Sequence, residues 1–188
     1  GYHGAKLRRY QELIDFYISK GNMNILNMLN TKYFIVKSDK GPIAQQNKNA
    51  LGNAWFVSEI MKVENSDKEI ELLGQINLRN QAVVDDRFTT PEKIAFDSSS
   101  SIALISYKAN HIIYETSASE NQFAVFSEIY YDKGWNAYID GKLVNHVRAN
   151  YLLRGLEVPS GIHKIDFKFE PSTYYTGEKV SLASSGLL

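Results

Sequence analysis

The chain contains no cysteine, only four prolines in 188 residues, and no excess charge of either sign, with 21 Lys and Arg against 21 Asp and Glu. The missing cysteine excludes disulfides, thiolate nucleophiles and zinc sites built on cysteine, but it fits every compartment. Nucleic-acid binding needs clustered Lys and Arg to neutralise phosphates, so we expect no nucleic-acid partner. What is plentiful is tyrosine, with 12 residues, which together with the scarce proline favours strands over helices.

Sequence motifs for catalysis, metals and nucleotides are also missing. There is no HExxH pair, EF-hand loop, Gly-rich phosphate loop or GxSxG elbow. The histidines are scattered, and His163 lies on the apolar side of a predicted strand, which favours a core position. Asp85 and Asp86 are adjacent and would point to opposite faces of a strand, so we interpret them as solvated acids. We therefore expect no metal, no cofactor and no catalytic residue in this chain.

No apolar run is long enough to cross a membrane, which takes ~20 residues as a helix. Gly1 begins the chain without an initiator Met or a leader pattern, so we expect a piece of a longer protein. The last residues, from Val180 to Leu188, are uncharged and increasingly apolar. Two readings stay open: a frayed tail, or the truncated start of a transmembrane helix over 178–188, with Tyr174 and Tyr175 as interfacial aromatics.

Residues 1–97 predict a mixed α/β segment. Apolar residues at helical spacing predict a helix over Ala5–Ser19, and Asn22 is a candidate cap for a short second helix. We expect Tyr33–Val36 to be a buried strand, residues 40–52 a loop, and Trp55–Val63 one further strand. A short helix follows, for which Ser66 and Glu69 predict a capping box and Gly74 the end.

Residues 98–177 predict an antiparallel β-sandwich of jelly-roll type. The serines at 98–101 are typical of a turn, and the residues after them alternate between apolar and polar. Asp140-Gly141 predicts a type I′ hairpin turn between Trp135–Ile139 and Lys142–Arg148. Short strands with regularly spaced turns are typical of sandwiches. The fold class we expect is therefore α+β, with the mixed segment first and the sandwich second.

Two groups of side chains are candidates for ligand binding. Tyr130, Tyr138 and Tyr151 lie on or beside the predicted hairpin, where exposed rings would stack on sugars, although large aromatics mostly supply core burial. His3, Lys6 and Arg9 form a basic run that would offer a cationic rim to an anionic group. The alternative for that run is a solvated helix face on which Arg8 pairs with Glu12.

Several motifs together resemble one known family. They are Tyr2–Gln11, Asn27–Tyr33, Gly52–Val57, Ala137–Lys142, Arg148–Tyr151 and Tyr174–Lys179. In this order they are similar to the extracytoplasmic C-terminal region of the bacterial membrane protein YfhO family, over nearly the whole chain. The resemblance implies relatives of GT-C membrane glycosyltransferases, which take sugar from a lipid-linked donor outside the cytoplasm, and it favours a severed transmembrane helix at the C-terminal end.

Three hypotheses follow from the residues and the resemblance. In the first, the chain is a non-catalytic extracytoplasmic domain that positions a glycan or cell-wall polymer for a membrane glycosyltransferase. Its partners would be the transmembrane part of the same protein, a lipid-linked sugar or wall glycan, and the adjacent membrane. In the second, it is a purely structural or assembly domain. In the third, it is an independent carbohydrate-active enzyme, which requires two carboxylates converging on one cleft.

Overall fold

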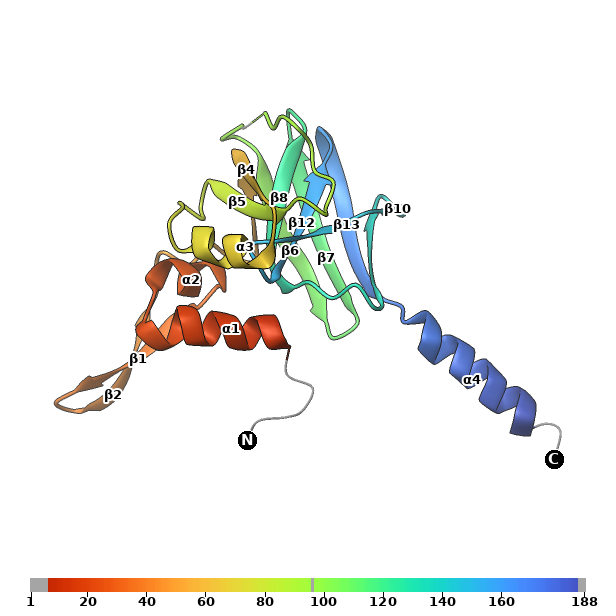
Figure 1. Cartoon of the computed structure of the whole chain (residues 1–188), viewed down its shortest axis with the longest axis horizontal. Helices are drawn as coiled ribbons and strands as arrows, with labels where there is room; N and C mark the ends of the chain where they lie inside the picture. The colour runs from red at the N-terminus through yellow and green to blue at the C-terminus, as the bar shows by residue number, and fades with distance from the viewer. Residues whose placement is uncertain (1–6, 96, 186–188) are drawn as a thin grey trace.

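The chain folds into several β-sheets accompanied by a few short helices. The structure is a computed structural model and describes residues 7–95 and 97–185. Within these residues the helical elements are α1 (Arg8–Phe16), the 3-10 helix η1 (Ile18–Lys20), α2 (Met23–Met28), α3 (Ser66–Leu73) and α4 (Ser172–Ser185). Most of the helices are short and pack on or beside the sheets, while α4 extends away from them (Figure 1).

Two larger antiparallel sheets dominate the fold. One has the strand order β10 (Lys142–Val144), β9 (Trp135–Ile139), β13 (Gly161–Phe169), β7 (His111–Ala118) and β6 (Ser101–Lys108). The other has the order β11 (Val147–Ala149), β12 (Leu153–Val158), β8 (Gln122–Ile129) and β3 (Ala54–Val57). Because β3 pairs with β8, residues from both sides of position 97 share one sheet.

The two larger sheets share an apolar core. Phe126 of β8 lies 4.9 Å, centroid to centroid, from Tyr114 of β7 and 4.9 Å from Phe167 of β13, with the rings edge to face in both pairs. The opposite face of β8, with Phe123 and Val125, packs against a second core formed with α1, α2 and α3. Both faces of β8 are therefore buried, which explains its nearly continuous apolar sequence.

Two small sheets complete the structure. β4 (Glu59–Val63) and β5 (Gln81–Asp85) pair in parallel, and α3 connects them. β1 (Tyr33–Ser38) and β2 (Gly41–Gln46) form an antiparallel hairpin that projects from the molecule beside α2 (Figure 1). The fold is thus mostly β with a few short helices, which agrees in part with the expected α+β class.

The first half of the chain differs from several sequence-based expectations. The predicted strand 55–63 is two strands in different sheets, because the chain bends at Ser58, where the N–H groups of Ser58 and Glu59 both point to the Asn80 carbonyl. The predicted loop at 40–52 contains strand β2. The run at 33–36 is a strand as expected but is not buried, since it lies in the projecting hairpin.

Helix caps were predicted with mixed success. Asn22 caps α2 by accepting a hydrogen bond from the Ile25 N–H, as expected. For α3 the cap is Asn65 and not Ser66, because the Asn65 side chain accepts from the Lys68 N–H. The predicted capping box was therefore wrong, and the Glu69 side chain is left for other contacts, whereas Gly74 ends α3 as expected.

The Asp140-Gly141 hairpin is confirmed. Both residues have positive φ, 49° and 79°, as a type I′ turn requires. The strand after it is shorter than predicted, since the run 142–148 divides into β10 and β11, which belong to different sheets. The chain crosses from one larger sheet to the other at Asn145-His146, and this crossing shapes the site described below.

The C-terminal helix begins earlier than the expected 178–188, at Ser172. Over the described residues, none of the helices combines the length with the apolar character that crossing a bilayer demands.

Candidate functional site

A cavity of about 600 Å³ opens where the chain crosses between the two larger sheets. Its apolar wall comes from both sheets and includes Phe123, Ile139, Val147 and Leu156. Its polar residues are Thr89, Asn121, Asp140, Lys142, Asn145, Glu157 and His163, several of which are exposed. An apolar wall with a few hydrogen-bonding groups is the usual make-up of a small-molecule site.

Gly155 allows Phe123 to form this wall. A Cβ at Gly155 would lie 2.6 Å from Cζ of Phe123, and 3.1 Å from Cβ of Ala149. The absence of a side chain at position 155 therefore lets the Phe123 ring pack closely against strand β12. Any larger residue would push Phe123 toward the space that the cavity occupies.

His163 and Asp140 form a fixed ion pair at the cavity. Nδ1 of His163 lies 2.6 Å from Oδ2 of Asp140, and Nε2 lies 3.0 Å from the Ser160 carbonyl oxygen. Because both ring nitrogens face acceptor oxygens, this arrangement favours the protonated imidazolium form of the ring. The hydrogen bond to Asp140 raises the pKa of His163, and the same bond lowers the pKa of Asp140. His163 is thus paired beside the cavity and is not the core histidine expected from its strand position.

The polar residues suit binding better than catalysis. The second oxygen of Asp140 accepts the Lys164 N–H at 2.9 Å, so both of its carboxylate oxygens are occupied. A glycosidase needs one carboxyl free as an acid and a second free as a base or nucleophile. Of the acids that line the cavity, only Glu157 has no partner in the described part of the chain. The cavity therefore offers hydrogen bonds and an apolar surface without an acid–base pair.

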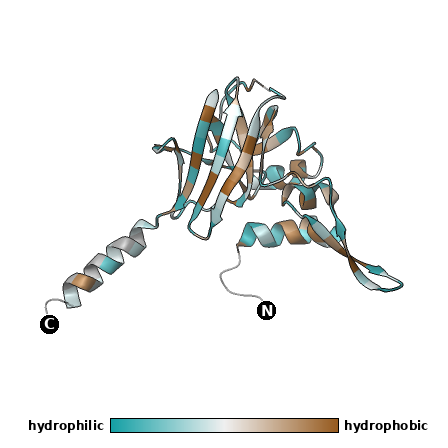
Figure 2. Ribbon diagram, turned by 180° about the vertical axis from the view of Figure 1, so that it is seen from behind, coloured by the Kyte–Doolittle hydropathy of each residue, from teal (hydrophilic) through white to brown (hydrophobic). Residues whose placement is uncertain are grey.

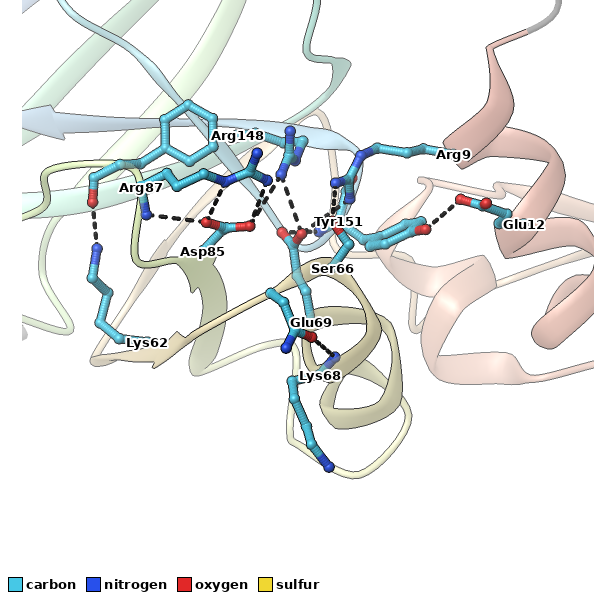
Figure 3. Close-up of polar contacts among 12 residues, drawn as sticks. Arg9, Glu12, Lys62, Ser66, Lys68, Glu69, Asp85, Arg87, Arg148 and Tyr151 are labelled. Carbon is cyan, nitrogen blue, oxygen red and sulfur yellow. Dashed lines mark hydrogen bonds and ion pairs between the residues drawn. The ribbon is translucent and has the colours of Figure 1, made fainter.

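A second polar cluster surrounds the buried carboxylate of Glu69 on α3 (Figure 3). Oε2 of Glu69 forms ion pairs with Nη1 of Arg9 on α1 at 3.0 Å and with Nη2 of Arg148 on β11 at 3.4 Å. It also accepts the backbone N–H of Tyr151 at 2.9 Å. Burial raises the pKa of Glu69, and the two arginines oppose that shift.

Asp85, at the end of β5, extends the charge cluster. Its carboxylate makes a bidentate pair with Arg87 at 2.8 and 2.7 Å, which lowers the pKa of Asp85 to about 2. Asp86 next to it is exposed, whereas Asp85 is fully buried, so the expectation of two solvated acids holds for Asp86 and is wrong for Asp85. This cluster joins α1, α3, β5 and β11, and most of its charged groups pair with one another, although the buried Nε of Arg148 has no hydrogen-bond partner among the described residues. We interpret it as structural, because little of it is open to a ligand.

The candidate ligand-binding residues do not gather in one place. Arg9 and Tyr151 do meet, since the Arg9 guanidinium lies 4.3 Å from the centre of the buried Tyr151 ring, whose hydroxyl donates to Glu12. Tyr130 is half-buried against Phe88 and His146. Tyr138 lies elsewhere and donates to Glu170 at 2.7 Å. Whether these side chains contact a ligand stays a prediction.

Some of the candidate site residues lie outside the described residues, and others are exposed. His3 and Lys6 lie outside the described residues, as does the side chain of Tyr175. Tyr174 is exposed on α4. Arg8 pairs with Glu12 at 2.8 Å, which is the solvated-face alternative for the basic run. Within the described ranges, no group of three His, Asp or Glu side chains is placed to hold a metal ion.

Sequence reasoning missed the cavity, although it predicted one turn beside it. Asp140-Gly141 was expected as a turn, and the fold brings it close to Ser160 through the His163–Asp140 and His163–Ser160 contacts. Glu69 was missed as well, because its partners Arg148 and Tyr151 lie about 80 residues away in the sequence.

Comparison with known proteins finds a family that resembles part of the chain. The family described as "Bacterial membrane protein YfhO" matches residues 92–181, which include Arg148, Tyr151 and most of the cavity. Over these residues, just under half of the chain, the protein is similar to the YfhO family. It is 24% identical over 112 residues to the uncharacterized protein YfhO of Bacillus subtilis (strain 168), a match that covers 59% of this chain and 13% of that protein. No solved structure matches.

Similarity to the YfhO family supports association with a membrane, since the family is described as a bacterial membrane protein. Arg9, Glu69 and the β1–β2 hairpin lie before the matched region, whereas β6 to β13 lie within it. The matched region therefore includes all of the five-stranded sheet and the residues that flank the Asp140-Gly141 turn.

Proposed function

We propose that this chain is a non-catalytic, extracytoplasmic domain of a membrane glycosyltransferase of the YfhO family, and that its cavity holds part of a glycan or cell-wall polymer acceptor. The observation that carries the proposal is the cavity itself, with its apolar wall and its amide and carboxylate side chains at the mouth. We further propose that the two larger sheets form a β-sandwich of jelly-roll type, whose open end is the ligand end.

The chemistry of the cavity favours a neutral, hydroxyl-rich ligand. The positive charge of His163 is balanced by Asp140, and the remaining Lys142 and Glu157 have opposite signs. A polyanion would meet no excess of positive charge there. Sugar hydroxyls instead both donate and accept hydrogen bonds, and the side chains of Asn121, Asn145 and Glu157 can supply the partners. The C–H faces of a sugar can pack against the apolar wall.

Titration of the 188-residue chain with wall-polymer fragments and oligosaccharides tests this proposal. Backbone amide NMR shifts should change at Asn145 and Glu157, and the double variant Asn145→Ala/Glu157→Ala should bind at least tenfold more weakly, as expected from two hydrogen bonds of ~1 kcal/mol each. Glu115→Ala, an exposed acid on β7, is the matched control. If no glycan binds, or if Glu115→Ala weakens binding equally, the acceptor role is wrong.

A structural role is the second candidate, and the Glu69 cluster favours it. The cluster fixes α1 rigidly on α3 and the β11–β12 turn, as a domain that only packs against the transmembrane part of its own protein would need. In that case cavity variants would leave the full-length protein active, whereas variants of Glu69 would reduce its amount in the membrane.

A further inference from the structure

The segment 18–50 is basic, although the whole chain is neutral. It contains five lysines and one acid, which are Lys20, Lys32, Lys37, Lys40, Lys48 and Asp39. All five lysines are exposed, and none forms an ion pair with a described residue. The positive charge is therefore available to an external anionic surface.

The same segment presents an uncovered apolar face. In the β1–β2 hairpin, Ile35 lies opposite Ala44, Lys37 lies opposite Pro42, and Tyr33 is two residues before Ile35, so these side chains share one face. The hairpin pairs with no other described strand. Ile35 is 74% exposed and Tyr33 59%. An isolated two-stranded hairpin is marginally stable alone, and an exposed apolar face on it indicates a contact surface.

The hairpin lies on the same side of the molecule as α4. Figure 1 shows the hairpin tip and the end of α4 on the lower side, below the larger sheets. Figure 2 shows hydrophobic segments along the hairpin strands and a hydrophilic tip, which contains Asp39 and Lys40.

We propose that the β1–β2 hairpin is a membrane-contact element that lies on an anionic bilayer. A bilayer surface has both properties that this segment complements, which are negative headgroups for the lysines and an apolar interior for Ile35, Pro42 and Ala44. Tyr33 beside them is an amphipathic aromatic of the type enriched at membrane interfaces. The hairpin lies flat on the bilayer and does not insert by its tip, because the tip carries Asp39 and Lys40.

Vesicle flotation of the full 188-residue chain tests the proposal. The chain should float with vesicles that contain phosphatidylglycerol and much less with pure phosphatidylcholine, and binding should fall as salt rises. Replacing Lys32, Lys37 and Lys40 with Gln together should weaken binding by roughly fivefold per lysine. Ile35→Glu should abolish most of the vesicle binding that does not depend on these lysines.

Two control variants make the test specific to the hairpin. Ile162→Glu changes an isoleucine of nearly equal exposure, 73%, on β13 and should leave binding unchanged. Leu182→Glu on α4 separates the hairpin from the C-terminal helix, and it too should leave the phosphatidylglycerol dependence unchanged. The proposal is overturned if Ile35→Glu binds like the unmodified chain, if Leu182→Glu alone removes binding, or if no vesicle binds at low salt. Glycan binding is measured separately, so either proposal can fail alone.

Discussion

The backbone N–H of Tyr151 donates a hydrogen bond to Glu69 at 2.9 Å and thereby joins α3 to the turn between β11 and β12. At this turn Asn150 and Tyr151 both have positive φ, 50° and 70°, which is uncommon for residues other than glycine. The carboxylate of Glu69 also holds Arg9 and Arg148. A single buried acid therefore fixes a strained turn and compensates two buried or half-buried cations.

Glu69→Gln should destabilise the fold by about 3 kcal/mol, because removing one partner of a buried ion pair leaves uncompensated charge. The Gln side chain can still accept the Tyr151 N–H, so the loss reports the charge and not the hydrogen bond. Urea unfolding measures the change. Glu71→Gln, in the same helix but exposed, should change stability by less than about 0.5 kcal/mol. Equal effects of the two substitutions would show that Glu69 carries no special charge role.

Asn150→Ala and Asn150→Gly should destabilise the fold to different extents. Oδ1 of Asn150 accepts the Val83 N–H at 2.9 Å, and both variants leave that buried donor unpaired, at a cost of about 1–3 kcal/mol. Alanine also adopts positive φ unfavourably, which adds about 1 kcal/mol, whereas glycine does so freely. Chemical denaturation should therefore rank the variants with alanine below glycine. The reverse order would exclude backbone strain at this turn.

Local features of this fold were predictable from sequence. Asp140-Gly141 was identified because the type I′ turn depends on two adjacent residues alone, and Asn22 because a helix cap depends on the following turn. The run at 33–36 shows the limit of such reasoning. Its apolar residues form a strand in any case, but whether that strand is buried depends on whether another element covers it, and in the described residues none covers Ile35.

The polar clusters could not be predicted, because each depends on long-range contacts. Glu69 was interpreted as part of a capping box from its spacing to Ser66, yet the cap is one residue earlier and Glu69 instead pairs with Arg148, 79 residues away. Tyr151 was considered a candidate for sugar stacking, and its ring is instead covered by Arg9 from the N-terminal helix. Such pairings follow from the tertiary fold and not from local pattern.

Gly155→Ala should destabilise the fold by about 1–3 kcal/mol and reduce the cavity, since the new Cβ would lie 2.6 Å from the Phe123 ring. Thermal unfolding gives the stability, and NMR shifts of Val147 and Leu156 report the displaced ring. Gly177→Ala is the control, because a Cβ there meets nothing within 4 Å and its helical position favours alanine. If both variants are equally stable, the contact between strand β12 and Phe123 does not limit the packing.

His163→Gln should lower stability more at pH 5.5 than at pH 8.5. The folded-state pKa of His163 is raised by Asp140, so its contribution is complete below the unfolded value of 6.5 and is lost as pH rises through the folded value. The pKa of Asp140 is lowered by His163, so that contribution is present above 3.8 and is lost only as pH falls through the lower, folded value. Both contributions are therefore present at pH 5.5.

The comparison must be made between variant and unmodified chain at each pH, because His146 acts in the opposite direction. Burial lowers the pKa of His146 to about 4, so the unfolded state gains protons first and stability falls as pH drops below 6.5. Subtracting the free energy of unfolding of His163→Gln from that of the unmodified chain cancels this effect. A difference that is equal at both pH values, or larger at pH 8.5, would mean that His163 is not held as an imidazolium by Asp140 and the Ser160 carbonyl.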